Sequence, residues 1–487
     1  MIKKILIIKL INLSCLLYSM SIEGFYESQI GRTQESDSFD WNIWDPNFYL
    51  ETRMFGNPNN NTSYYIKFYP YKDYNDSFRS LAVMSESNIS FRDEINGYGF
   101  NSILFFRESQ HYWLDGSMLN LLNTGIVNND GNGQGARLDM WHKFNGSMTY
   151  VFSDFSQGDS DDIHLMRYRQ SFLNEKVNTG FYILRKNYSS GMSNEYNQVI
   201  ASDLKLFFER YFLNTEIAVS KVPSDGSIEI LNNNYDEDEI FKSNIAFQTE
   251  LRGLRLGAPK LGYWFINPGF FSFGNTYRNY LGDNQSNKYG YWINTYYLVP
   301  ERAVTLVMNY NFYEKIIPDT ISLDYTSEKM ITNPITNLYT EIYIEFINGF
   351  KGKISFNKKD EFWQGQYYKH YDILSELSVE NYLAKLLAQY KIKDFGEIWE
   401  KQITGVELSV NLTEQWKFFT RGMIVNDRVG SRYSFFTEFQ YRTSGNTELY
   451  FQYGPNYLGQ YGLTNDDGFA SSGSMIKELK IILKGWF

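Results

Sequence analysis

Apolar and polar residues alternate along many short stretches of this sequence, from one end of the chain to the other. In residues 432–442, RYSFFTEFQYR, Phe435 and Phe439 fall on one side of an extended chain, while Glu438 and Arg442 fall on the other. Successive side chains of a strand point to opposite faces of a sheet. Residues 241–252, 337–347 and 406–412 repeat the pattern. The alternation therefore predicts an all-β fold whose sheet has one apolar and one polar face.

The length of the alternating segments narrows the choice of fold. They run for about 9 to 12 residues, which is the span a tilted strand needs to cross a bilayer. We expect about 18 to 24 of them, with boundaries that are uncertain by a few residues. Some links are short, such as NGS and TSGNT, whereas residues 111–135, 222–239, 267–287, 314–333 and 454–474 form long ones. Short turns at one rim and long loops at the other are typical of a transmembrane β-barrel.

A closed antiparallel barrel is favoured over a soluble sandwich, propeller or solenoid, which would also alternate. In hydrocarbon every backbone amide needs an internal partner, so a spanning sheet must close on itself. Aromatic residues make up 18% of the chain, and the polar faces carry charges of both signs, which suits a wet lumen. Residues 378–393, SVENYLAKLLAQYKIK, also fit a short helix, but their alternation favours a strand.

The first 21 residues are predicted to be a signal peptide. Lys3 and Lys4 precede an apolar stretch over residues 5–17, and small residues follow at Ser19 and Ser21. An uncleaved anchor helix is the alternative, but about 13 apolar residues are short for spanning a bilayer. Residues 22–487 then form a single barrel domain, which lacks the only cysteine. Cleavage of the predicted signal peptide removes three lysines and changes the formal net charge from -10 to -13. Such an acidic chain argues against nucleic acid as a partner.

The chain ends in LKIILKGWF. Leu479, Ile481, Leu483 and Phe487 fall on one face of this final run, against lysines on the other. This ending resembles the C-terminal β-signal of Gram-negative outer-membrane proteins, which closes the barrel and is read by the outer-membrane assembly machinery; Gly485 departs from that pattern. The resemblance to porin-like proteins implies an outer-membrane location, contact with lipid bilayer and lipopolysaccharide, and, as in many porins, a homotrimer. It points to no particular porin family.

Charged residues on the predicted polar faces are the candidate pore lining. Opposite charges across a pore would order water and filter polar solutes, although the same residues could instead pair across neighbouring strands. One long loop is expected to fold inward as a constriction, but the sequence does not say which. The candidate pore-lining residues are Glu51, Arg53, Lys67, Arg167, Arg169, Lys242, Glu250, Arg252, Glu341, Glu345, Glu407, Arg421, Glu438 and Arg442.

Nothing in the sequence points to catalysis. It lacks the nucleophile-elbow, zinc-protease and phosphate-loop motifs, and His164 is predicted to line the lumen beside two arginines. We therefore expect no enzyme, no cofactor and no metal site. The predicted function is a porin-like channel for passive or facilitated diffusion of small hydrophilic solutes, sugars or oligosaccharides among them. The alternatives are a non-channel barrel that acts as an adhesin, receptor or anchor through its loops, and a secreted soluble glycan-binding protein.

Overall fold

The structure is a computed structural model of the full chain. It describes residues 20–34, 48–73, 79–108, 117–121, 133–154, 162–190, 193–221, 244–258, 261–274, 276–281, 287–299, 303–318, 330–347, 349–363, 366–443, 445–455 and 477–487. Most of the predicted signal peptide (residues 1–19) and Lys242 lie outside this part of the chain. Within it, no helix is long and apolar enough to cross a membrane.

The described part of the chain forms strands joined by turns and loops. In chain order they are β1 (Met20–Gln34), β2 (Phe48–Asn59), β3 (Thr62–Asp73), β4 (Arg79–Ile95), β5 (Tyr98–Glu108), β6 (Gly133–His142), β7 (Gly146–Asp154), β8 (Asp162–Phe172), β9 (Val177–Ser190), β10 (Ser193–Phe207), β11 (Phe212–Lys221), β12 (Ile245–Arg252), β13 (Leu254–Ala258), β14 (Gly262–Phe273), β15 (Lys288–Val299), β16 (Val304–Pro318), β17 (Met330–Ile347), β18 (Phe350–Trp363), β19 (Gln366–Glu380), β20 (Ala384–Lys393), β21 (Lys401–Asn411), β22 (Trp416–Asp427), β23 (Gly430–Arg442), β24 (Thr447–Tyr453) and β25 (Lys477–Trp486).

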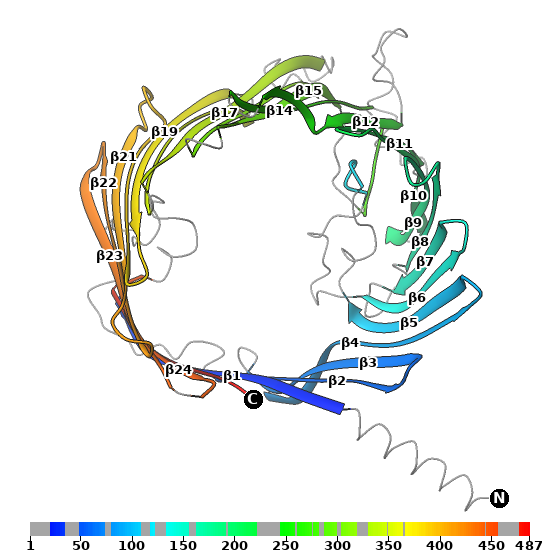
Figure 1. Cartoon of the computed structure of the whole chain (residues 1–487), viewed down its shortest axis with the longest axis horizontal. Helices are drawn as coiled ribbons and strands as arrows, with labels where there is room; N and C mark the ends of the chain where they lie inside the picture. The colour runs from blue at the N-terminus through cyan, green and yellow to red at the C-terminus, as the bar shows by residue number, and fades with distance from the viewer. Residues whose placement is uncertain are drawn as a thin grey trace, which may run out of the picture.

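These strands form one sheet that closes into a ring, in which each strand pairs antiparallel with its neighbours along the chain (Figure 1). The last strand, β25, pairs with β1 over ten register positions, so the sheet has no free edge. Both β12 and β13 pair with β14 and follow one another across Gly253, so the 25 segments make a barrel of 24 strands. The closed antiparallel barrel is confirmed, at the upper limit of the predicted strand number, and no soluble sandwich or propeller is formed.

Turns and loops divide between the two rims as predicted. The links β2–β3, β4–β5, β6–β7 and the corresponding links around the ring are short. The start of β1 and the end of β25 lie on this rim. In the β4–β5 turn, Asn96 and Gly97 have φ of 55° and 78°, the left-handed conformation of the two-residue turns whose twist matches the strands. Asn and Gly reach these angles at little cost. The long links, such as those after β5, β11 and β24, leave the opposite rim.

Strand boundaries differ from the sequence prediction in three places. Residues 378–393 form the end of β19, a turn and β20, so the helical alternative is wrong. The predicted loop at 267–287 starts too early, because β14 continues through Phe273 and its aromatic side chains belong to the wall. The predicted loop at 314–333 is shorter, because β16 extends to Pro318 and β17 begins at Met330. Apolar side chains such as those of β14 are compatible with a strand or with a loop. The period-two pattern alone therefore placed the ends of these strands wrongly.

The outward-facing side of the barrel is apolar. On β25 the side chains of Leu479, Ile481 and Leu483 are 37–49% exposed and alternate with buried or half-buried Glu478, Ile482 and Lys484. Near the rim of short turns, exposed aromatic side chains such as Phe144, Phe208 and Tyr382 add a girdle of the kind that lies at membrane interfaces. A closed sheet with such an outer face satisfies every backbone group within hydrocarbon.

The closing pair β1–β25 explains why Gly485 departs from the predicted terminal pattern. A Cβ on Gly485 would come within 2.2 Å of the Tyr26 ring, and a Cβ on Gly24 would come within 2.0 Å of the Phe487 ring. Each glycine thus gives room to an aromatic ring of the other strand. The Gly24 N–H also donates to the Phe487 carbonyl at 2.8 Å, and the Phe487 N–H donates to Gly24 at 3.1 Å. Phe487 therefore pairs through both its backbone and its ring.

Candidate pore lining

Backbone registers assign every strand residue to one of two faces, because directly opposed partners share a face. Glu216 of β11 holds residues 117–121, the short cyan trace inside the ring in Figure 1, so its face is the lumen side. Following the registers around the ring, the described residues predicted to line the pore all fall on this same lumen side. They are Glu51, Arg53, Lys67, Arg167, Arg169, Glu250, Arg252, Glu341, Glu345, Glu407, Arg421, Glu438 and Arg442.

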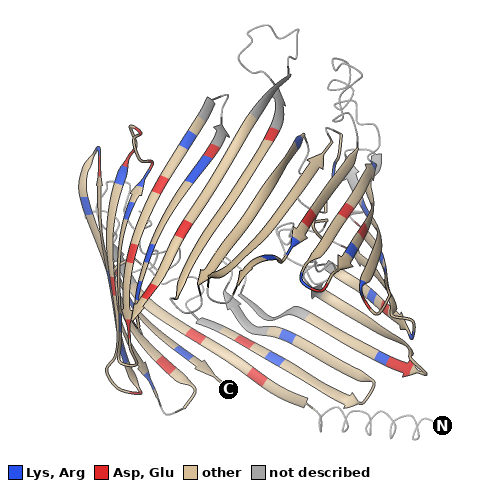
Figure 2. Cartoon of the chain, turned by 45° about the horizontal axis from the view of Figure 1, so that its top comes forward, with Lys and Arg blue, Asp and Glu red and all other residues tan. Residues whose placement is uncertain are grey.

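The charged residues of the lumen side pair mostly with near neighbours. Figure 2 shows positive and negative residues interspersed along the same strands. Glu51 lies 2.5 Å from Arg53, two residues along its strand, and 3.4 Å from Lys67 across the sheet. Glu250 and Arg252 repeat the first arrangement at 2.5 Å. This is the alternative that the sequence left open, in which the charges pair along the wall.

One stretch of the wall, the lumen side of β18–β25, is built around such pairs, and we call it the paired wall. Arg421 and Glu407 face each other on β21 and β22, with the guanidinium Nε donating to the carboxylate at 3.0 Å. Their side chains are only 12% and 10% exposed. Cross-strand pairs also join Lys353 to Glu376 at 3.4 Å, Asp372 to Lys391 at 3.4 Å and Arg442 to Glu448 at 3.3 Å.

The facing stretch, the lumen side of β7–β14, carries an apolar cluster that is covered by chain, and we call it the docked wall. Val151, Leu165, Leu184 and Val199 point inward from successive strands and are almost fully buried. They form one cluster with Leu119 and Leu121, which belong to the link between β5 and β6. The barrel thus has a hydrophobic core on one side of its interior, where chain from a long link packs onto the wall.

A buried carboxylate anchors residues 117–121 to the docked wall. Glu216 is 1% exposed and accepts hydrogen bonds from the Ser117 hydroxyl at 2.8 Å and from the backbone N–H groups of Met118 at 2.5 Å and Leu119 at 3.2 Å. A buried carboxylate is tolerated when several donors satisfy its oxygens. Glu216 therefore fixes the position of this segment by charge-assisted hydrogen bonds.

A second segment, residues 276–281 of the β14–β15 link, lies beside the first. The Asn197 side chain donates to the Arg278 carbonyl at 3.1 Å and accepts from the Tyr280 N–H at 3.0 Å. The Asn279 amide donates to the Leu121 carbonyl at 3.1 Å, which joins the two segments. The predicted inward fold of a loop is therefore made by two links, at residues 117–121 and 276–281.

Tyr277 seals the second segment against the wall. Its side chain is fully buried, and its ring lies 6.1 Å from that of Phe273 at the end of β14. Burial raises the pKa of the Tyr277 hydroxyl, and the nearby Glu216 carboxylate raises it further. The hydroxyl therefore stays neutral in the docked segment across the physiological pH range.

Sequence reasoning missed several inward-facing residues, most clearly Glu216 and the rim residues Arg92, Asn101 and Asp139. The last three stand directly opposite one another on β4, β5 and β6. The Asn-Gly turn at residues 96–97 fixes the phase of β4 and β5, so this signal was available in the sequence. No local signal pairs Glu216 with a segment about a hundred residues earlier.

His164 does not face the lumen. His164 lies on the outward side of β8, where its ring is 5.1 Å from Phe152 and its Nδ1 is 3.1 Å from the Tyr150 hydroxyl, so its predicted lumen position is wrong. Leu165 and Ile163, its neighbours, face inward instead. Among the described residues no three His, Cys, Asp or Glu side chains are grouped to hold a metal ion.

Comparison with known proteins gives likeness of fold alone. No family model and no curated protein matches the chain. Similar solved structures include the P pilus usher (PapC) translocation pore, with TM-score 0.42, 8% identity, and coverage of 96% of this chain and 99% of that one. The siderophore receptor PirA from Acinetobacter baumannii has TM-score 0.43, 7% identity, and coverage of 96% and 80%. The copper transporter OprC has TM-score 0.43, 10% identity, and coverage of 96% and 80%.

The closed sheet and its apolar outer face place the protein in a bilayer. Large antiparallel barrels of even strand number, with short turns on one rim and long loops on the other, are the architecture of bacterial outer membranes. The chain is an outer-membrane β-barrel.

Proposed function

We propose that the barrel is a porin-like channel that passes small hydrophilic solutes by diffusion, with a lumen narrowed by residues 117–121 and 276–281. The observation that carries this proposal is the asymmetry of the interior. Chain covers the apolar cluster of the docked wall, whereas the paired wall carries ion pairs and charges of both signs. The proposed path for solutes runs along the paired wall.

A wall with charges of both signs suits a path for small polar solutes. Its ion pairs present local dipoles to the lumen, which keep the path wet and offer hydrogen bonds to a solute. The proposal includes no chemical step and no cofactor. Lipopolysaccharide around the outer face and a homotrimeric assembly stay predictions.

Conductance of the purified, refolded barrel in planar bilayers tests the channel. We expect discrete current steps with a small preference for chloride over potassium, because charges of both signs line the lumen and the inward lysines and arginines of the paired wall outnumber its carboxylates. The control is a preparation kept unfolded in urea, which should give no steps. A folded barrel that never opens a pore would reject this function and favour the role of an anchor with binding loops.

We also propose that Leu479, Ile481, Leu483 and Phe487 form the signal read by the outer-membrane assembly machinery. Support comes from the closing pair, where Phe487 covers Gly24 and completes the last backbone contacts. Deleting Phe487 should reduce the folded, heat-modifiable barrel in outer-membrane fractions at least several-fold. The matched control is Phe144→Ala, which removes an exposed aromatic side chain from the same rim. Equal assembly of the deletion and the parent chain would refute the signal.

A further inference from the structure

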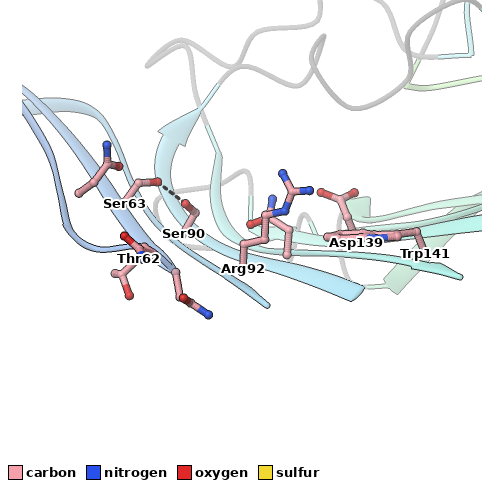
Figure 3. A pocket seen from close by; sticks show the side chains of 10 residues that line it. Thr62, Ser63, Ser90, Arg92, Asp139 and Trp141 are labelled. Carbon is pink, nitrogen blue, oxygen red and sulfur yellow. Dashed lines mark hydrogen bonds between the residues drawn. The ribbon is translucent and has the colours of Figure 1, made fainter. Parts of the chain in front are cut away.

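A polar hollow of about 670 Å³ lies on the lumen side of β3–β6, at the rim that carries the short turns (Figure 3). Arg92, Asn101 and Asp139 form a row across its floor, because they are direct register partners on three successive strands. Figure 3 shows the Arg92 and Asp139 side chains rising from their strands into the hollow. Ser63 and Ser90, whose hydroxyls are 2.5 Å apart, bound it on the side of β3.

Contacts with the Trp141 ring fix the position of the Arg92 side chain. The Arg92 guanidinium lies 4.9 Å from the centre of the Trp141 ring, and Trp141 is itself fixed by an N–H donated to Glu94 at 3.3 Å. The ring also lies against Gly99, where a Cβ would approach it to 2.3 Å. Stacking fixes the plane of a guanidinium and so pre-orients its remaining donors. The Arg92 side chain is 67% exposed, which leaves those donors accessible to a solute.

Asp139 supplies acceptors beside these donors. Its carboxylate is held by Arg137 Nε at 3.0 Å and by the Thr149 hydroxyl at 2.7 Å. A carboxylate has about four lone-pair sites, so two held bonds leave capacity for a solute. The hollow therefore offers a fixed donor fork and a fixed acceptor, about two strand spacings apart, with an amide between them.

The rest of the lining narrows the class of solute. Four asparagines and three hydroxyl residues surround the Arg92 and Asp139 pair. Among the described residues that line the hollow, Trp141 supplies the only ring and none is aliphatic. Such a site matches a solute that is dense in hydroxyls, balanced in charge and without apolar side chains. Its volume lies within the range of small-molecule sites. A peptide would need apolar pockets for its side chains, which this lining does not provide.

We propose that this hollow is a saccharide-binding subsite at the mouth of the barrel formed by the short turns. A role in passage through the membrane rests on the proposed channel function, whereas binding itself does not. Vicinal hydroxyls of a sugar ring would accept from the Arg92 fork and donate to Asp139, with Asn101 bridging the two. A subsite at one mouth would hold a sugar that enters or leaves the lumen there.

Isothermal titration of the full barrel in detergent micelles tests binding without requiring conduction. The probes are maltotriose, cellotriose and tri-N-acetylchitotriose, with triglycine and a polyethylene glycol of similar hydrodynamic radius as comparisons. We expect at least one trisaccharide to bind, and to bind at least tenfold more weakly to Arg92→Ala and to Asn101→Ala. Arg210→Ala, which removes an exposed arginine from the β10–β11 turn on the same rim, should bind the sugar like the parent chain.

The outcomes separate this inference from the channel proposal. Current steps in bilayers without binding of any trisaccharide would overturn the subsite and leave the channel intact. Binding in micelles without current steps would uphold the subsite and reject the channel. Tighter binding of triglycine than of every sugar, or equal sugar affinity for Arg92→Ala and the folded parent barrel, would also overturn the saccharide assignment.

Discussion

The docked wall and the paired wall are parts of the same antiparallel sheet, yet different interactions stabilise their inward side chains. The docked wall carries a cluster of buried aliphatic and aromatic side chains that includes Leu119, Leu121 and Tyr277 of the two docked segments. The paired wall carries ion pairs between residues of neighbouring strands. Burial of apolar surface stabilises the docked wall, whereas ion pairing stabilises the charged side chains of the paired wall.

The two walls also differ in how their polar groups are used. On the docked wall, Glu216 is almost fully buried and accepts hydrogen bonds from three donors of one segment. On the paired wall the pairs join neighbouring strands, so losing one would disturb the wall locally. We therefore expect substitutions in the docked wall to change the pore through the position of a segment, and those in the paired wall to change ion preference.

Glu216→Ala should have the largest effect. It leaves the Ser117 hydroxyl and two backbone N–H groups without their acceptor, at a cost of about 4 kcal/mol to the docked state. The segment should detach, so single-channel conductance should rise and residues 117–121 should become sensitive to protease. Glu216→Gln keeps one carbonyl acceptor, so its conductance should lie between that of the parent chain and that of Glu216→Ala. Parent-like conductance in a folded Glu216→Ala barrel would show that the segment does not narrow the pore.

Replacing one buried phenylalanine on each wall compares the walls directly. Phe273 is 2% exposed and contacts Tyr277 of the docked segment, while Phe436 is 7% exposed and packs with Ile403 and Met423 of the paired wall. Each change to alanine should cost about 3 kcal/mol in the free energy of unfolding, measured by urea titration. Only Phe273→Ala should also raise conductance. Equal conductance changes in both would remove the distinction between the walls.

The barrel could be predicted from the sequence, and so could the face of each described candidate charge, because both follow from a period of two. The role of Gly485 could not, since it depends on Tyr26, far away in the sequence. The docked segment could not be predicted for the same reason: Glu216 on β11 accepts a hydrogen bond from Met118 of the β5–β6 link, and no periodicity encodes that pairing. The sequence pattern of inward apolar residues such as Leu165 predicts a strand of the barrel wall, but it does not indicate which segment covers them.

Arg421→Ala should have a smaller effect, which is electrostatic. It leaves the poorly exposed Glu407 without its guanidinium partner, at a cost of about 2 kcal/mol in the free energy of unfolding. The uncompensated carboxylate should shift the reversal potential in a potassium chloride gradient towards cation preference. The double change Glu407→Ala and Arg421→Ala should restore the parent potential. An unchanged potential in the single variant would indicate that solutes do not pass beside this pair.

The smallest effect concerns Tyr277 at alkaline pH. Its pKa is raised in the docked segment by burial first and by Glu216 second, so the docked state favours the neutral hydroxyl. This contribution is fully present below the ordinary tyrosine pKa near 10 and is lost as pH rises above it. Docking should weaken about fivefold between pH 10 and pH 11, with conductance flat from pH 6 to pH 9 and rising only above pH 10. Tyr277→Phe cannot ionise, so its conductance should stay flat throughout. A rise of equal size in the parent chain and the variant would show that ionisation of Tyr277 does not control docking.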